Sequence, residues 1–161
     1  MSPLFDVSEL VRIGVEDERT GVAFYGTLAQ KTADAELRKT YTGLEAQERH
    51  HQKRFEKMLA ELGSVQPSES YPGEYVAYLR AMLDSRAFPD AATARRVASE
   101  IAGNDAAALA QAVRFERDTL VLLNELREMV SAKDRETINE LTREEQGHLV
   151  VLTAAQQRLG S

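Results

Sequence analysis

The sequence predicts an all-α protein, a four-helix bundle made of two helical hairpins joined by a long crossover. Three of its four prolines, Pro67, Pro72 and Pro89, lie between Gly63 and Gly103, so the strongest helix breakers are confined to the middle of the chain. On both sides of this segment, apolar residues recur at alternating steps of three and four, a pattern typical of a bundle helix with one buried face. The 161 residues fit a single domain of ordinary size.

Capping residues and glycines divide the chain into helices. Four long helices are expected, at residues 7–31, 35–62, 105–130 and 133–159. Asp34 is the expected N-cap of the second helix, and Ser131 with Asp134 resembles a capping box at the start of the fourth. The crossover, residues 63–104, should carry two shorter amphipathic helices, at 74–85 and 91–102.

Composition excludes several classes of function. The chain has no cysteine, so it can form neither disulfides nor a thiolate metal site, and any metal must bind to oxygen and nitrogen. Its formal charge of −6 argues against a surface that binds nucleic acid or anionic membranes. Residues 1–6 do not resemble a secretory signal, and no apolar run approaches the roughly 20 residues of a membrane span. A soluble, cytoplasmic protein is expected.

Polar side chains interrupt the apolar stripe of every long helix at core-facing steps. The interrupting residues are Glu18, Glu48, His51, Glu116, Glu145 and His148. A buried, unpaired carboxylate costs several kcal/mol, and four in one core would also repel one another. Two divalent cations would balance four carboxylates, with the imidazoles as neutral ligands. The stripes therefore predict a site for two metal ions.

The spacing of these residues places them level with one another. Residues three apart lie about 60° apart on a helix, so Glu48 and His51 share a face. Glu18 and Glu48 are equidistant from residue 33 in the first predicted turn, and Glu116 and Glu145 are centred on the second turn. The two hairpins therefore repeat one construction, which suggests an internal duplication of about 50 residues.

These motifs resemble the rubrerythrin branch of the ferritin-like superfamily over nearly the whole chain. The resemblance is carried by Glu18 with Phe24-Tyr25, by Glu48-Arg49-His50-His51-Gln52-Lys53-Arg54-Phe55, by Phe115-Glu116-Arg117-Asp118, and by Glu145-Gln146-Gly147-His148. It implies a carboxylate-bridged di-iron centre, in which each helix pair supplies one Glu and one Glu-x-x-His motif. All four glutamates are then terminal or bridging ligands, and in this family the Glu-x-x-His glutamates usually bridge. The implied topology has a crossover that runs the length of the bundle, although an up-down-up-down bundle would also level the sites.

The resemblance implies an oxidoreductase that reduces hydrogen peroxide or dioxygen, or a ferroxidase with Fe²⁺ as its substrate. Two departures bear on this activity. Without cysteines the chain cannot form the four-cysteine iron site of classical rubrerythrins, so the electrons should come from an external donor such as a rubredoxin or a flavoprotein. Thr119 stands where those proteins have an additional Glu. Two alternatives stay open, namely a di-manganese or mixed-metal oxidase, and a non-catalytic metal-binding or iron-storage bundle. A homodimer is also expected.

Residues beside the predicted ligands have more than one interpretation. Tyr25 lies two turns from Glu18, so it can either hydrogen-bond a ligand or simply pack in the core. His50 lies off the stripe and is expected in solvent. Four acidic neighbours of the ligand candidates are expected on the solvated face: Glu16, Asp17, Glu45 and Glu144.

Overall fold

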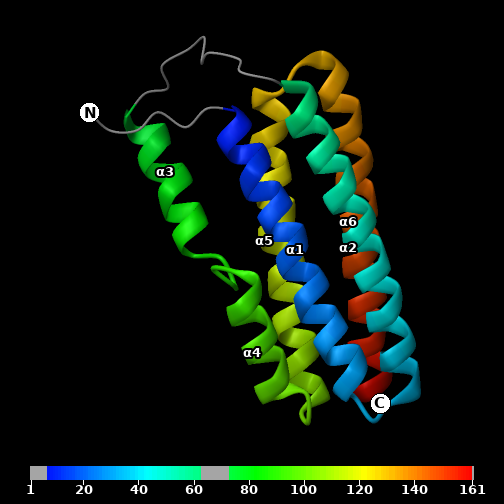
Figure 1. The fold of residues 1–161 in the computed structure, drawn as a ribbon. Helices are drawn as coiled ribbons and strands as arrows, with labels where there is room; N and C mark the ends of the chain where they lie inside the picture. Colours follow the sequence, from blue (N-terminus) through cyan, green and yellow to red (C-terminus); the bar gives the residue numbers. More distant parts are fainter. Residues whose placement is uncertain (1–6, 63–72, 161) are drawn as a thin grey trace.

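The computed structural model describes residues 7–62 and 73–160, and all its regular structure is helical (Figure 1). The helices are α1 (Val7–Lys31), α2 (Ala35–Leu62), α3 (Gly73–Asp84), α4 (Ala91–Ile101), α5 (Asp105–Met129) and α6 (Ala132–Gly160). The all-α prediction is confirmed. Gly63, which directly follows the predicted second helix and as a glycine was expected to end it, lies outside the described residues. Within the described ranges, no helix is long and apolar enough to cross a membrane.

The direction of the helices gives the topology. In Figure 1, α1 descends and α2 rises, α3 and α4 lead back down the side of the bundle, and α5 rises before α6 descends. α2 and α5 are therefore parallel, which requires a crossover that runs the length of the bundle. The up-down-up-down alternative is wrong.

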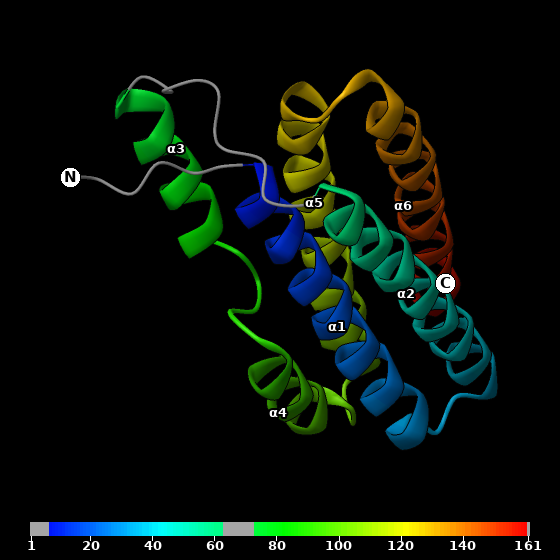
Figure 2. The same ribbon diagram turned by 45° about the horizontal axis from the view of Figure 1, so that its top comes forward.

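The four long helices form a bundle, and α4 packs against the outside of it. α1 packs against α2, α5 packs against α6, and the α1–α5 and α2–α6 contacts join the two hairpins. α4 packs against both α1 and α5 on the outside of the bundle, as Figures 1 and 2 show. Consequently α1 is buried on more than the single face that its apolar stripe predicted.

Two apolar clusters fill the bundle, and each long helix contributes to both. One lies toward the α1–α2 turn and includes Phe24, Tyr41 and Leu152. The other lies toward the α5–α6 turn and includes Phe55 and Ile138. On each long helix, the predicted ligands fall between the segments that belong to the two clusters. The polar residues therefore form a buried layer with apolar packing above and below it.

Capping contacts fix the helix starts that frame this layer. Asp34 Oδ1 accepts from the backbone N–H of Leu37 at 2.9 Å, and Asn104 Oδ1 accepts from that of Ala107 at 3.0 Å. At the second turn, the Asp134 backbone N–H donates to Ser131 Oγ at 3.2 Å. The starts of α2, α5 and α6 thus follow from local sequence.

Candidate metal centre

The structure brings the six predicted ligands together in the buried layer. They form two groups of four, whose potential ligand atoms lie within 4.8 Å of one another: Glu18, Glu48, His51 and Glu145, and Glu48, Glu116, Glu145 and His148. Every member is at most 2% exposed. Each group holds one imidazole and three carboxylates, which is a donor set for a divalent cation. Their role as ligands stays a prediction.

Glu48 and Glu145 are shared by the two groups. Glu145 presents Oε1 to His51 Nδ1 at 2.6 Å and Oε2 to His148 Nδ1 at 2.8 Å. Glu48 likewise lies between the two imidazoles, 4.0 Å from His51 Nδ1 and 3.4 Å from His148 Nδ1. A carboxylate that faces both groups can bridge two ions, so the geometry favours these two residues as the bridging pair.

Glu18 and Glu116 each belong to one group only. Glu18 Oε2 lies 3.6 Å from His51 Nδ1, and Glu116 Oε2 lies 3.4 Å from His148 Nδ1. This arrangement suits terminal ligands, one on each ion.

The two imidazoles are nearly parallel and point the same nitrogen inward. Their ring centroids are 5.4 Å apart with an interplanar angle of 15°. Both Nδ1 atoms face the carboxylates, while the outer Nε2 atoms contact Glu144 Oε2 at 2.7 Å for His51 and Gln47 Oε1 at 2.9 Å for His148. Each outer partner immediately precedes the Glu-x-x-His glutamate of the opposite helix.

These outer contacts were missed by the sequence prediction, which placed Glu144 on the solvated face. Its side chain is partly exposed, but its carboxylate also reaches back to His51. An outer hydrogen bond fixes the tautomer and orientation of a metal-binding histidine. The sequence signal that could have revealed this role is the repeated position beside the Glu-x-x-His motif.

Unpartnered polar atoms indicate that the layer fits positive ions. Among the described residues, three carboxylate oxygens of the predicted ligands are buried without a hydrogen-bond partner: Glu18 Oε2 and both oxygens of Glu48. Leaving such groups unsatisfied in a core costs free energy. Cations held between them would remove that cost, and the oxygen and nitrogen donors suit iron or manganese.

Burial and mutual repulsion perturb the protonation of the layer. Burial, reinforced by neighbouring carboxylates, raises the pKa values of Glu18, Glu48 and Glu116 well above the ordinary glutamate value. Burial also acts to raise the pKa of Glu145, but hydrogen bonds from His148 and His51 outweigh it and lower that pKa. The metal-free layer therefore retains protons that a cation would displace.

Tyr25 contacts the layer directly. Its hydroxyl donates to Glu116 Oε1 across the bundle, from α1 to α5. Burial, followed by the charge of Glu116, raises the pKa of Tyr25 well above its ordinary value. Of the two interpretations of Tyr25, the structure therefore favours a hydrogen bond to a ligand candidate.

Asp17 differs most from expectation, since it is buried rather than solvated. Its carboxylate accepts from the Thr119 hydroxyl at 2.8 Å and lies 3.6 Å from Arg86 Nη1. Burial raises its pKa to about 6, against the effects of Thr119 and Arg86. Arg86 lies in the crossover between α3 and α4, so this contact depends on tertiary packing that the stripe of α1 does not reveal.

Comparison with known proteins supports the fold. No protein-family profile matches the chain, and no curated protein sequence matches it significantly. Among solved structures, the chain is similar to a crystal structure from Thermotoga maritima described as a candidate ferritin-like diiron-carboxylate protein. The TM-score is 0.74 with 23% sequence identity over 98% of both chains. Together with the parallel α2 and α5, this similarity shows that the chain has the ferritin-like fold.

Proposed function

We propose that this protein holds a carboxylate-bridged di-iron centre and reduces hydrogen peroxide or dioxygen with electrons from an external donor. The observation that carries the proposal is the pair of four-residue groups that share Glu48 and Glu145. The similarity to a structure described as a diiron-carboxylate protein supports the choice of iron. The same donor atoms would also accept manganese.

Each residue of the layer has a defined part in this proposal. Glu18 and His51 would hold one ion, Glu116 and His148 the other, and Glu48 and Glu145 would lie between them. Bound iron would supply the two electrons that, with two protons, convert hydrogen peroxide to two molecules of water. The protein excludes bulk water from the layer, since all six side chains are buried.

Tyr25 supplies a proton-bearing group at the layer. Its hydroxyl proton lies on the hydrogen bond to Glu116 Oε1, so it can stabilise the charge of that carboxylate while Oε2 faces His148. This role is to orient and hold a ligand, which requires no change in the tyrosine itself.

A second candidate activity is ferroxidase or iron-storage chemistry, with Fe²⁺ as substrate. Thr119 favours it, since the position one turn after Glu116 holds no carboxylate, and the Thr119 hydroxyl is engaged by Asp17. Peroxide reduction that relies on an additional glutamate at this position is therefore unavailable to this chain. The same six ligands would serve either activity.

Rapid mixing separates these activities. Anaerobic protein loaded with Fe²⁺ is mixed with hydrogen peroxide and, separately, with oxygen, and the formation of Fe³⁺ is followed by absorbance. A much faster reaction with peroxide supports the peroxidase, and a faster reaction with oxygen supports the ferroxidase. Absence of oxidation by either reagent contradicts both.

A matched pair of variants shows whether the predicted layer is responsible. His51→Ala should abolish the rapid formation of Fe³⁺ because it removes a predicted ligand. His50→Ala changes the exposed neighbouring residue and should leave this reaction intact. Equal rates in the two variants would place the oxidation at another site.

A further inference from the structure

The two halves of the metal layer are related by an approximate internal symmetry that is broken beside the histidines. Glu48 and His51 of α2 correspond to Glu145 and His148 of α6. At the position before each of these glutamates, α2 has the neutral Gln47 and α6 has the acidic Glu144. The two imidazoles therefore have outer partners of different charge.

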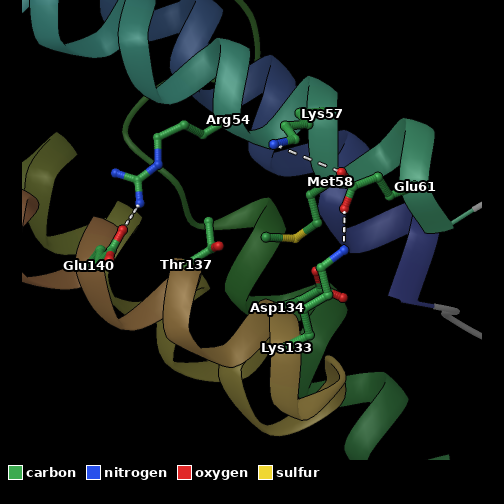
Figure 3. Close-up of a pocket in the computed structure, with 8 residues that line it drawn as sticks. All are labelled: Arg54, Lys57, Met58, Glu61, Lys133, Asp134, Thr137 and Glu140. Atoms are coloured by element: carbon green, nitrogen blue, oxygen red, sulfur yellow. Dashed lines mark hydrogen bonds and ion pairs between the residues drawn. The ribbon is translucent and has the colours of Figure 1, made fainter.

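The outer partner of His51 is a carboxylate that is itself held in place. Because a carboxylate only accepts, the Nε2–H of His51 donates to Glu144 Oε2 at 2.7 Å. Arg54 Nη1 donates to Glu144 Oε1 at 3.0 Å, and its Nη2 donates to Glu140 Oε2. Both Arg54 and Glu140 line a surface pocket of about 270 Å³. Figure 3 shows the contact between their side chains. The pair of ionic contacts limits the movement of Glu144.

The outer partner of His148 is uncharged, and no arginine stands at the position of α6 that corresponds to Arg54 of α2. The Nε2–H of His148 donates to the amide Oε1 of Gln47 at 2.9 Å. Val151, which lies three residues after His148 as Arg54 lies three after His51, is exposed. A charged outer partner is therefore present at His51 and absent at this place beside His148.

The two glutamates that belong to one group only, Glu18 and Glu116, also differ, and the difference again makes the His148 group the weaker set of donors. The Tyr25 hydroxyl donates to Glu116 Oε1, which belongs to the His148 group. A hydrogen bond to a carboxylate draws electron density from it and weakens it as a ligand. In the His51 group, Glu18 Oε2 is buried without a hydrogen-bond partner among the described residues.

We propose that the two metal positions are chemically unequal, and that the position formed by Glu18, His51, Glu48 and Glu145 takes the first divalent ion. A carboxylate on the outer nitrogen makes a ligating histidine a stronger donor, and disturbing such a partner typically changes metal affinity by about 10–100-fold. Glu144 is thus a positioning residue that acts through His51. This inference rests on the proposed metal centre.

Titration with Co²⁺ tests the order of filling. The metal-free protein is labelled with ¹⁵N-histidine, and its exchangeable imidazole protons are followed by paramagnetic NMR as Co²⁺ is added. His51→Ala and His148→Ala assign the two shifted signals. In the unmodified protein, the first equivalent should shift the His51 signal, and the His148 signal should follow with the second equivalent.

Exchanging the outer partners should reverse this order. Glu144→Gln should weaken the first binding step by about 10–100-fold. The double variant Glu144→Gln with Gln47→Glu should shift the His148 signal first, a result that a general loss of stability cannot produce. Glu136→Gln, an equal change of charge on an exposed residue of α6, should leave both steps unchanged.

The possible failures are distinguishable. The proposed inequality of the two positions is overturned if the two Co²⁺ ions bind without order, if the His148 signal shifts first, or if the exchange of outer partners leaves the order unchanged. None of these results would overturn the metal centre itself. Absence of Co²⁺ binding to the unmodified protein overturns the metal centre, and the inference with it.

Discussion

A Cβ atom on Gly21 of α1 would lie 2.9 Å from Cδ of Glu48 on α2. Real Cβ atoms essentially never make so close a contact, so the glycine creates the space that the shared carboxylate occupies. Gly21→Ala should displace Glu48 and lower the affinity for Co²⁺ by at least about tenfold, as expected from disturbing even an outer partner of a ligand. Isothermal titration calorimetry measures the change.

Gly147 provides the matched control for this variant. It adjoins His148 on α6, but an added Cβ would meet no atom of the described residues within 4 Å. Gly147→Ala should leave Co²⁺ affinity unchanged and stabilise the helix by up to about 1 kcal/mol. Full affinity in Gly21→Ala would show that Glu48 does not need its present position.

Tyr25 and Tyr41 should respond differently to the loss of their hydroxyl groups. Tyr25→Phe leaves Glu116 Oε1 without its donor, so the metal-free protein should lose about 1–3 kcal/mol of unfolding free energy. The Tyr41 hydroxyl is buried without a hydrogen-bond partner among the described residues, so Tyr41→Phe should be neutral or stabilising. Urea denaturation measures both. Equal losses would contradict a specific role for the Tyr25 hydrogen bond.

Metal binding should release protons and strengthen as pH rises. Burial raises the pKa values of Glu18 and Glu116, so these ligand candidates retain protons that a cation would have to displace. His148 adds to the effect, because its bonds to carboxylates outweigh burial and raise its pKa. Calorimetry in two buffers of different ionisation enthalpy should give at least about one proton released per ion. An enthalpy independent of the buffer would contradict this protonation state.

Asp17→Asn should change how the stability of the metal-free protein depends on pH. Burial raises the folded-state pKa of Asp17 from its ordinary 3.8 to about 6. The folded state therefore binds this proton more tightly, and the resulting stability is lost as pH rises through that interval. The unfolding free energy of Asp17→Asn, minus that of the unmodified protein, should therefore rise by up to about 3 kcal/mol as the pH increases from 4 to 7. A pH-independent difference, measured by urea denaturation, would show that Asp17 does not titrate in this way.

The positions of the six ligand candidates could be predicted because a charged residue within an apolar stripe must share the stripe's buried face. Glu48 and His51 interrupt the stripe of α2 between Leu44 and Phe55, and all four side chains are buried. The starts of α2 and α5 could also be predicted from sequence, since Asp34 and Asn104 cap these helices through local hydrogen bonds. These features depend on periodicity and on neighbours in the sequence.

The surroundings of the site could not be predicted in the same way, because they depend on contacts between distant segments. Asp17 is buried because α4 and the Arg86 segment cover a second side of α1, which the period of α1 alone does not encode. Glu144 reaches His51 from another hairpin, through a side-chain rotation that residue spacing leaves undetermined. The homodimer and the electron donor involve other molecules and stay predictions.

Metal analysis of the purified protein tests the di-iron centre most directly. After anaerobic loading with Fe²⁺ and removal of excess metal, we expect about two iron ions per chain, bound by the two groups that share Glu48 and Glu145. Glu48→Ala and Glu145→Ala should each lose both ions, while the exposed control Glu136→Ala should retain them. Undiminished iron in Glu48→Ala and Glu145→Ala, or no iron in the unmodified protein, would contradict the proposed centre.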